Sequence, residues 1–218
     1  ILKTRRFGYD GKGQARLKGP EDIAQAFADM NGAPAILEGF VKFDYEVSVI
    51  GARGLNGDFA SFTPGENVHK DGILDTTTVP SRLSVQAMHE AQGMAARILE
   101  KLDYVGVMGV ELFVTKQGLV VNEIAPRVHN SGHWSIEGAV TSQFENHIRA
   151  ICGLPLGDTR RVAPRVVMEN VIGPASATAY EALRDPAAHL HLYGKTDAPE
   201  GRKMGHITRL EWPEEGPA

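Results

Sequence analysis

Two apolar runs of this sequence, separated by a short loop, constrain the fold more than any other feature. Val110 to Val114 and Leu119 to Ile124 are rich in apolar and β-branched residues. The loop between them, Lys116 to Gly118, contains the glycine that short hairpin loops favour. The sequence therefore predicts a β-hairpin with a three-residue loop.

The predicted hairpin brings two carboxylates together. With this loop, Glu111 lies directly opposite Glu123. Phe113 and Val121 share their face of the sheet, because side chains alternate along a strand. Facing like charges destabilise a sheet unless something compensates them. Mg²⁺ would do so, because it prefers one or two carboxylates with phosphate oxygens and water. A register shifted by one residue, or a glutamate paired with an arginine, are the alternatives.

Polar and cationic residues follow the second glutamate closely. They are Pro126, Arg127, His129, Asn130, Ser131 and His133. Such a group beside two carboxylates strengthens the metal interpretation of the hairpin.

The composition excludes several classes of function. The chain is 42% hydrophobic and 23% charged, which is ordinary for a soluble globular protein. A net charge of −4, without basic runs interleaved with aromatics, argues against nucleic-acid binding. No apolar run is long enough to span a membrane and no leader is present, so we expect a cytoplasmic protein. Cys152 is the only cysteine, which excludes a disulfide framework, and we expect it to be buried.

The first residues have the pattern of a strand inside a fold. The sequence opens without methionine on Ile1 to Thr4. We therefore expect the chain to be a fragment of a longer protein.

A glycine-rich segment follows that strand. Gly8 to Gln14, GYDGKGQ, contains three glycines whose backbone N–H groups can surround phosphate oxygens. Lys3 and Lys12 would add positive charge. The segment lacks the spacing of a P-loop, and an ordinary hairpin turn is the alternative interpretation.

Three further polar residues lie in or beside predicted strands. Glu38 interrupts the apolar segment from Ala35 to Val41 and suits a strand edge that meets a ligand hydroxyl or amino group, or else an exposed strand end. Glu46 lies in the alternating segment from Tyr45 to Ile50. A histidine in the position of His69 is more often a surface residue than a ligand contact.

Helices and strands alternate irregularly over the rest of the chain. Ser84 is a good N-cap for a helix that ends near Leu102. Ser142 to Cys152 predicts a second helix, and Ile73 to Val79 and Arg165 to Ile172 predict strands. The fold class is therefore α+β, with a small C-terminal elaboration.

A set of segments spread over nearly the whole chain matches one family. They are Lys3; Gly8, Tyr9, Asp10, Gly11, Lys12, Gly13 and Gln14; Glu38, Gly39, Phe40 and Val41; Glu46; His69; Glu111; the run NEIAPRVHNSGH from Asn122 to His133; Lys195; and Gly201 to His206. This set resembles the ATP-grasp ligases and, among them, the 5-(carboxyamino)imidazole ribonucleotide synthases of purine biosynthesis. The glycine-rich loop and the long run are specific in combination, whereas either alone would indicate only the superfamily.

The resemblance implies a fold and a reaction. Residues 1–153 would form an ATP-grasp domain of antiparallel sheets and packed helices, its N-terminal part missing, and residues 154–218 a small β-rich subdomain. ATP would phosphorylate bicarbonate to carboxyphosphate, which yields carbon dioxide to the amino group of aminoimidazole ribonucleotide. The resemblance also implies magnesium as cofactor and a homodimer, while this fragment alone would bind ATP weakly and lack turnover.

The resemblance assigns the nucleotide-side residues as follows. Lys3 and the loop from Gly8 to Gln14 would cover the ATP phosphates, Glu38 to Val41 would meet the adenine, and Glu46 would hold the ribose hydroxyls with His69 nearby. Glu111 and Glu123 would hold magnesium, and Asn122 would belong to the nucleotide site.

It assigns the remaining residues to the other substrates. Arg127, His129 and Asn130 would be catalytic and face bicarbonate, carboxyphosphate and the imidazole. Ser131, His133, Lys195 and Arg202 would bind the ribonucleotide, and the last two would bind its 5′-phosphate.

The sequence departs from the general ATP-grasp pattern at one position, and two alternative functions remain open. Many ATP-grasp enzymes have a metal-binding asparagine two residues after the second glutamate, where this chain has Ala125, as the narrower family does. A different ATP-grasp ligase, such as a formate-dependent glycinamide ribonucleotide transformylase, is one alternative. A nucleotide-binding or dimerising module without chemistry of its own is the other.

Overall fold

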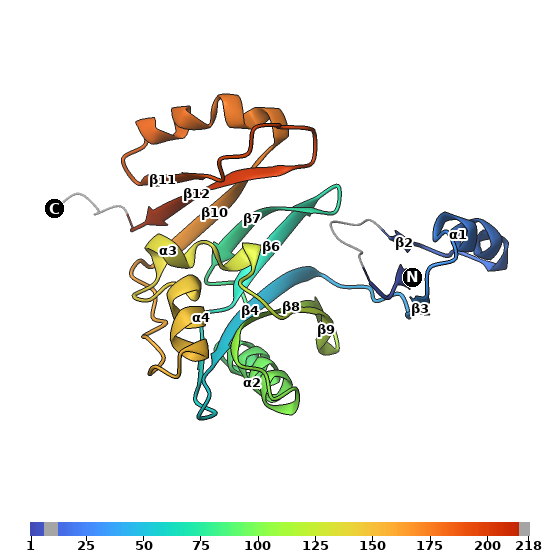
Figure 1. The fold of residues 1–218 in the computed structure, drawn as a ribbon, viewed down its shortest axis with the longest axis horizontal. Coiled ribbons are helices and arrows are strands. Elements are labelled where there is room, and N and C mark those ends of the chain that lie inside the picture. The colour runs from blue at the N-terminus through green and yellow to red at the C-terminus, as the bar shows by residue number, and fades with distance from the viewer. Residues whose placement is uncertain (7–12, 214–218) are drawn as a thin grey trace. The chain divides into compact units, whose positions relative to one another are not determined.

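The structure, a computed structural model, describes residues 1–6 and 13–213, which form two compact units (Figure 1). The first unit contains Ile1–Lys42 and His69–Ile73. The second contains Phe43–Val68 and the chain from Leu74 onward.

The first unit is a small sheet with one helix. The strand β1 (Leu2–Thr4) lies between β2 (Gln14–Ala15) and β3 (Ala35–Leu37) and is antiparallel to both. A 3-10 helix, η1 (Pro20–Asp22), leads into α1 (Ile23–Asp29). The core of this unit consists of Leu2, Ala26 and Met30. The predicted first strand is confirmed.

The second unit is built on a larger sheet. Its strand order within the described residues is β11-β12-β10-β7-β6-β4-β8-β9, with β5 beside β4. These strands are β4 (Tyr45–Arg53), β5 (Phe59–Ser61), β6 (Gly65–Lys70), β7 (Ile73–Val79), β8 (Gly106–Thr115), β9 (Gly118–Ala125), β10 (Arg165–Ile172), β11 (Ala188–Leu192) and β12 (Lys203–Glu211). Strand β8 pairs antiparallel with β4 and β9, and β10 with β7 and β12.

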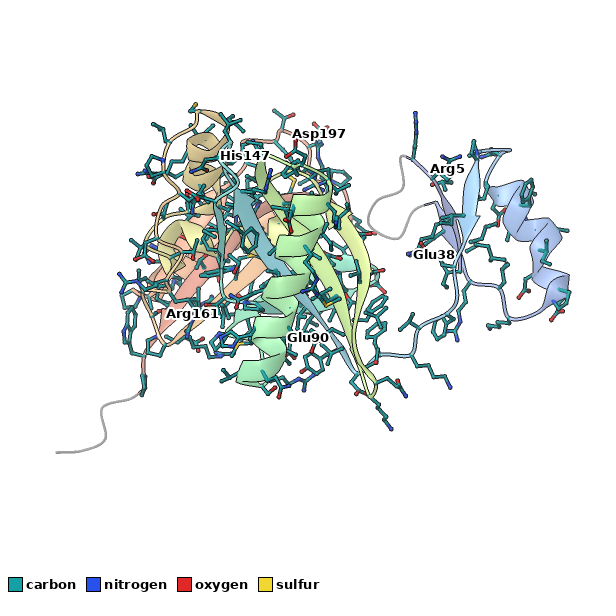
Figure 2. The ribbon with its side chains drawn as sticks, turned by 90° about the horizontal axis from the view of Figure 1, so that it is seen from below. Arg5, Glu38, Glu90, His147, Arg161 and Asp197 are labelled. Atoms are coloured by element: carbon teal, nitrogen blue, oxygen red, sulfur yellow. The ribbon has the colours of Figure 1, made fainter. Side chains whose placement is uncertain are left out.

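Helix α2 (Val85–Lys101) covers one face of this sheet, and Figure 2 shows it there with Glu90 labelled. Ser84 is its N-cap, because the Ser84 hydroxyl accepts a hydrogen bond from the Ala87 N–H at 3.2 Å. Successive turns of α2 pack against alternate residues of β4 and β8. The core between them contains Ala91, Ala95 and Leu99 of α2, Val47 and Val49 of β4, and Met108, Val110 and Leu112 of β8. The predicted helix from Ser84 is confirmed.

The opposite face of β4 and β8 carries the second core. Ile50, Ala52 and Val107 pack with Trp134 there. Trp134 precedes α3 (Ser135–Gly138), which is followed by α4 (Gln143–Ile151). Strands alternate their side chains between two faces, so residues on the even positions of β4 lie on this side.

The remaining elements are short. They are the 3-10 helices η2 (Asn130–Gly132), η3 (Gly173–Ala177) and η4 (Ala179–Arg184). Cys152 is exposed at the end of α4, so the expectation of a buried cysteine is wrong. In the described ranges, no helix is long and apolar enough to cross a membrane. The domain boundary expected after residue 153 stays a prediction.

Candidate functional site

The turn between β8 and β9 differs from the prediction. Strand β8 ends at Thr115 and β9 starts at Gly118, so Lys116 and Gln117 alone form the turn. Gly118 has a φ of 124°, a conformation that favours glycine, and it pairs with Thr115. The prediction of a three-residue loop is therefore wrong.

An extra residue in β9 nevertheless brings the two glutamates opposite each other. Val121 pairs with Leu112, and Glu123 pairs with Glu111. Asn122 between them has no partner in the ladder and forms a β-bulge. Because Leu112 faces α2, Val121 does not share the face of Glu111, and that part of the prediction is wrong.

The same register extends the carboxylate face onto β4. Ser48 lies opposite Glu111, and Glu46 lies opposite Phe113. Glu46, Glu111 and Glu123 therefore share the sheet face that is turned away from α2. The Glu111 side chain is only 12% exposed, whereas Glu123 is exposed.

This face also carries two buried polar atoms without partners in residues 1–6 and 13–213. They are Ser48 Oγ and Asn67 Nδ2. Asn67 lies opposite Glu46. Buried polar atoms in folded proteins are nearly always bonded to protein, water or an ion. Carboxylate oxygens beside the Ser48 hydroxyl fit a hydrated hard cation such as Mg²⁺, whereas Asn67 Nδ2 can only donate, to water or to a carboxylate.

The alternative pairing with arginine does not occur in the described part of the chain. Glu123 has no ion pair there, and Glu111 lies beside His129, whose Nε2 is 3.5 Å from Glu111 Oε1. An imidazole thus lies beside the first of the two glutamates.

Residues 126–135, the motif loop, bring His129 against the sheet. Gly109 of β8 makes the room, because a Cβ atom there would lie 2.8 Å from His129 Cβ. The His129 Nδ1 atom lies 2.8 Å from Ser131 Oγ. The imidazole therefore bridges Ser131 and Glu111, and it is buried.

Gln143, the first residue of α4, holds the backbone of the motif loop. Its Oε1 accepts a hydrogen bond from the His129 N–H at 2.9 Å, and its Nε2 donates to the His129 carbonyl at 2.7 Å. Gly132 is required for this approach, because a Cβ atom there would lie 2.6 Å from Gln143 Oε1. We missed Gln143 in the sequence because it reads as the start of an amphipathic helix behind its Ser142 cap.

Asn130 is also fixed by side-chain hydrogen bonds. Its amide exchanges two bonds with the amide of Asn170 on β10, at 2.9 and 2.7 Å. Asn170 Nδ2 also donates to the Leu74 carbonyl at 2.8 Å. Arg127, in contrast, is exposed and donates to the Val128 carbonyl at 3.0 Å.

His133 joins the motif loop to the C-terminal strands. Its ring stacks on Phe144 at 5.4 Å and lies 5.1 Å from the ring of His206 and 6.2 Å from that of Tyr193. The Tyr193 hydroxyl is 2.9 Å from His206 Nδ1. Burial lowers the pKa of His133 to about 4 and that of His206 to about 3. Burial raises the pKa of Tyr193 to about 12.

A third histidine extends this group. His191 of β11 stacks on His206 at 4.6 Å, and its Nε2 lies 2.6 Å from Glu137 Oε1. Sequence reasoning missed Tyr193 and His191 as neighbours of His133, because the end of β11 is far from the motif loop along the chain.

The two cations expected at the 5′-phosphate lie on residues 193–202, the β11–β12 loop. Lys195 Nζ donates to the Lys203 carbonyl at 2.6 Å and lies 5.5 Å from the Tyr193 ring centroid. Arg202 Nη1 lies 3.3 Å from Asp197 Oδ2, and Asp197 is labelled in Figure 2. Both cations are exposed.

In the first unit, Lys3 and Glu38 form an ion pair of 2.8 Å. Glu38, labelled in Figure 2, follows β3, and its carbonyl accepts a hydrogen bond from the Ile1 nitrogen at 2.8 Å. The residues after it, Gly39 to Val41, continue without regular structure. The ring of Phe40 lies 4.0 Å from the Arg16 guanidinium.

The other predicted nucleotide contacts of this unit are partly outside the described residues. Gly13 and Gln14 are described, Gln14 in β2 opposite Lys3. His69 lies in β6. Gly8, Tyr9, Asp10, Gly11 and Lys12 lie outside the described residues.

Comparison with known proteins identifies the family. Residues 1–144 match the family model of the ATP-grasp domain. The chain belongs to the ATP-grasp family. Residues 166–214 of this ATP-grasp chain match the model of the phosphoribosylaminoimidazole carboxylase C-terminal domain. The prediction of an ATP-grasp fold is confirmed.

Relatives of this ATP-grasp chain have the name of the synthases that its sequence motifs resemble. The N5-carboxyaminoimidazole ribonucleotide synthase of Brucella melitensis is 56% identical over 214 residues, which cover 97% of this chain and 59% of the relative. A solved structure of the synthase from Aspergillus clavatus complexed with ATP is 35% identical, with a TM-score of 0.90, and the match covers 96% of this chain and 57% of that one. A second structure from that organism, with ADP and 5-aminoimidazole ribonucleotide, is 33% identical with a TM-score of 0.88, covering 96% and 56%. The ATP-grasp chain thus spans somewhat more than half the length of these relatives.

Proposed function

We propose that this chain is part of an ATP-dependent ligase that carboxylates 5-aminoimidazole ribonucleotide. The observation that carries the proposal is the 56% identity to a synthase of this name over 97% of the chain. The second family match, over residues 166–214, favours this activity over that of another ATP-grasp ligase.

The proposed reaction has two steps. Bicarbonate attacks the γ-phosphorus of ATP, which gives carboxyphosphate and ADP. Carboxyphosphate then releases phosphate and yields carbon dioxide to the 5-amino nitrogen of the ribonucleotide, which loses a proton. The product is 5-(carboxyamino)imidazole ribonucleotide.

Arg127, His129 and Asn130 are the proposed contacts of bicarbonate and carboxyphosphate. His129 is held between Ser131 and Glu111, and Asn130 is held by Asn170. Fixed groups of this kind stabilise a developing charge without reorganising during the reaction. The exposed guanidinium of Arg127 is suited to two-point contact with an oxyanion.

Glu111 and Glu123 are the proposed ligands of Mg²⁺. Their facing positions and the orphaned Ser48 Oγ support this role. When bound, the ion neutralises charge on the phosphate oxygens. Glu46, on the same face, would accept hydrogen bonds from the ribose hydroxyls of ATP, with Asn122 at the edge of the site.

The first unit would contribute the remaining ATP contacts. We propose that Lys3 and the loop from Gly8 to Gln14 bind the phosphates and that Glu38 to Val41 bind the adenine, with His69 nearby. The Lys3 ammonium has a carboxylate partner, Glu38, that a phosphate oxygen would replace or share.

Ser131, His133, Lys195 and Arg202 are the proposed contacts of the ribonucleotide. The two cations of the β11–β12 loop make exposed bonds, to a carbonyl and to Asp197, that cost little to exchange for a 5′-phosphate. We also propose, from the resemblance, that the enzyme is a homodimer in the cytoplasm. Light scattering tests the oligomeric state.

The deciding experiment measures ADP release by the intact protein with Mg²⁺, bicarbonate and aminoimidazole ribonucleotide. We expect turnover to require all three. Turnover that ignores the ribonucleotide, or that uses formate and glycinamide ribonucleotide instead, contradicts the proposal. Calorimetric binding of ATP with no turnover would identify a nucleotide-binding module.

A further inference from the structure

The orientation of the Gln143 amide is fixed by two backbone groups. A backbone N–H can only donate and a backbone carbonyl can only accept. The Gln143 atom 2.9 Å from the His129 nitrogen is therefore its oxygen, and the atom 2.7 Å from the His129 carbonyl is its nitrogen. The opposite orientation would set donor against donor and acceptor against acceptor.

This orientation decides where His133 carries its proton. The Gln143 nitrogen has two hydrogens, and the one not used by His129 points to His133 Nδ1 at 3.0 Å. Nδ1 must accept, so it is unprotonated. The hydrogen of the neutral ring is then on Nε2, which has no hydrogen-bond partner within residues 1–6 and 13–213.

The groups around His133 also oppose a second proton. Arg127 of the motif loop, and Lys203, His191 and His206 of the C-terminal strands, face it, and Tyr193 lies against it as a neutral phenol. Burial is the larger cause of the low pKa of His133, about 4, and the cations add to it.

We infer that Gln143 is a positioning residue that fixes His133 as a neutral imidazole with its hydrogen on Nε2. His133 then presents an N–H donor, and not a cation, to an acceptor atom of the ribonucleotide. This last step rests on the proposed function, whereas the tautomer does not.

The tautomer is measured directly in the full chain labelled with ¹⁵N in its histidines. Two-bond ¹H–¹⁵N spectra distinguish the two neutral tautomers and the imidazolium, and the His133→Gln variant identifies the His133 signals. We expect the Nε2–H pattern, unchanged from about pH 6 to about pH 8. An Nδ1–H pattern for the assigned His133 signals, or a titration near the ordinary histidine value of about 6.5, overturns the inference.

The Gln143→Glu variant tests the cause. The ionised carboxylate has no hydrogen to donate and offers only oxygen lone pairs to His133, so a bond between them requires a hydrogen on Nδ1. We expect the His133 signals to change to the Nδ1–H or imidazolium pattern. The control is Gln92→Glu on α2, whose amide also donates to a carbonyl, that of Phe62, and it should leave His133 unchanged. Unchanged His133 signals in Gln143→Glu overturn the positioning role.

The kinetic arm tests the contact with the ribonucleotide. We expect Gln143→Glu to lower kcat/KM for the ribonucleotide by about tenfold or more, as for a lost hydrogen bond to a charged group, and to change KM for ATP little. A changed tautomer with unaltered kinetics overturns the substrate contact of His133. Absence of ribonucleotide-dependent turnover in the unmodified protein contradicts the proposed function but leaves the tautomer result standing.

Discussion

The motif loop and the β11–β12 loop carry groups for the same proposed reaction in opposite ways. In the motif loop, Asn130 and His129 are held by hydrogen bonds to buried or half-buried partners, and Gln143 is 0% exposed. In the β11–β12 loop, Lys195 and Arg202 are exposed and bond to a carbonyl and to an exposed carboxylate.

The difference indicates that the motif loop orients groups at the reacting atoms, whereas the β11–β12 loop attracts the phosphate of the ribonucleotide by charge. Groups that act on the reacting atoms gain from a fixed geometry, because nothing reorganises in the transition state. Groups that bind a distant phosphate supply charge, and long exposed side chains do this without rigid support. Changes in the first region should therefore reduce kcat or stability, and changes in the second should raise one KM.

Glu123→Gln should have the largest effect. It removes one charge facing Glu111 but no buried volume, because Glu123 is exposed. We expect kcat to fall by about a hundredfold or more in the intact enzyme, with the free energy of unfolding within about 0.5 kcal/mol of the unmodified protein. Glu100→Gln, on the exposed side of α2, is the control. Near-normal turnover at saturating Mg²⁺ would exclude Glu123 from the metal site.

Gly132→Ala tests the rigidity of the motif loop. The new Cβ atom would lie 2.6 Å from Gln143 Oε1 and 2.9 Å from Ile50 Cγ1, so the loop must move. We expect a loss of about 1–3 kcal/mol in the free energy of unfolding, measured with urea. Gly93→Ala on α2 is the control, because the Cβ atom there meets only the end of the Arg97 side chain at 3.3 Å, and it should not destabilise. Equal free energies of unfolding for the two variants would show that the motif loop moves at no cost and is not rigid.

The histidines that join the two regions predict a dependence on pH. His133 and His206 have folded-state pKa values of about 4 and about 3, below the unfolded value. The unfolded chain therefore gains protons first as the pH falls. The contribution of the two neutral histidines to the free energy of unfolding is complete above about pH 6.5. It is lost as the pH falls toward 4 for His133 and toward 3 for His206, by about 1–2 kcal/mol for each histidine at pH 5.

Urea unfolding at two pH values measures this loss. His206→Gln should show a smaller difference in the free energy of unfolding between pH 7.5 and pH 5 than the unmodified chain does. His89→Gln on the exposed side of α2 is the control and should show the full difference. If His206→Gln behaves like His89→Gln, His206 titrates normally.

Arg202→Ala should have the smallest effect and the most selective one. We expect KM for the ribonucleotide to rise by about tenfold, because a charged bond to its phosphate is lost, while KM for ATP and the free energy of unfolding change little. Arg184→Ala, an exposed arginine of η4, is the control. An equal rise in both KM values would indicate a structural role for Arg202.

Local patterns in the sequence predicted most elements of the fold. The bounds of β7 and β10 agree with the predicted strands, and Ser84 caps α2 as expected. One error arises because glycine suits both a hairpin loop and the first position of a strand. The residue type of Gly118 predicts a loop position, but Gly118, with a φ of 124°, is the first residue of β9.

The candidate site was predicted in part, for a physical reason. The glutamate pair follows from alternation within a hairpin, and the family motif supplied the rest of the predicted residues. Gln143, Tyr193 and Asn170 act on those residues across separate elements. Periodicity gives the face of an element but not its neighbour, so these contacts required the structure.

The bulge at Asn122 has a consequence for which length changes this chain can accept during evolution. An added residue between Lys116 and Gln117 lengthens a solvent-side turn and leaves the ladder beyond Thr115 and Gly118 as it is. An added residue between Gly118 and Val121 shifts every later residue of β9 by one, which would turn the second carboxylate toward the packed side of the sheet. Natural variants should therefore differ in length at the tip of this hairpin and keep the count along its second strand.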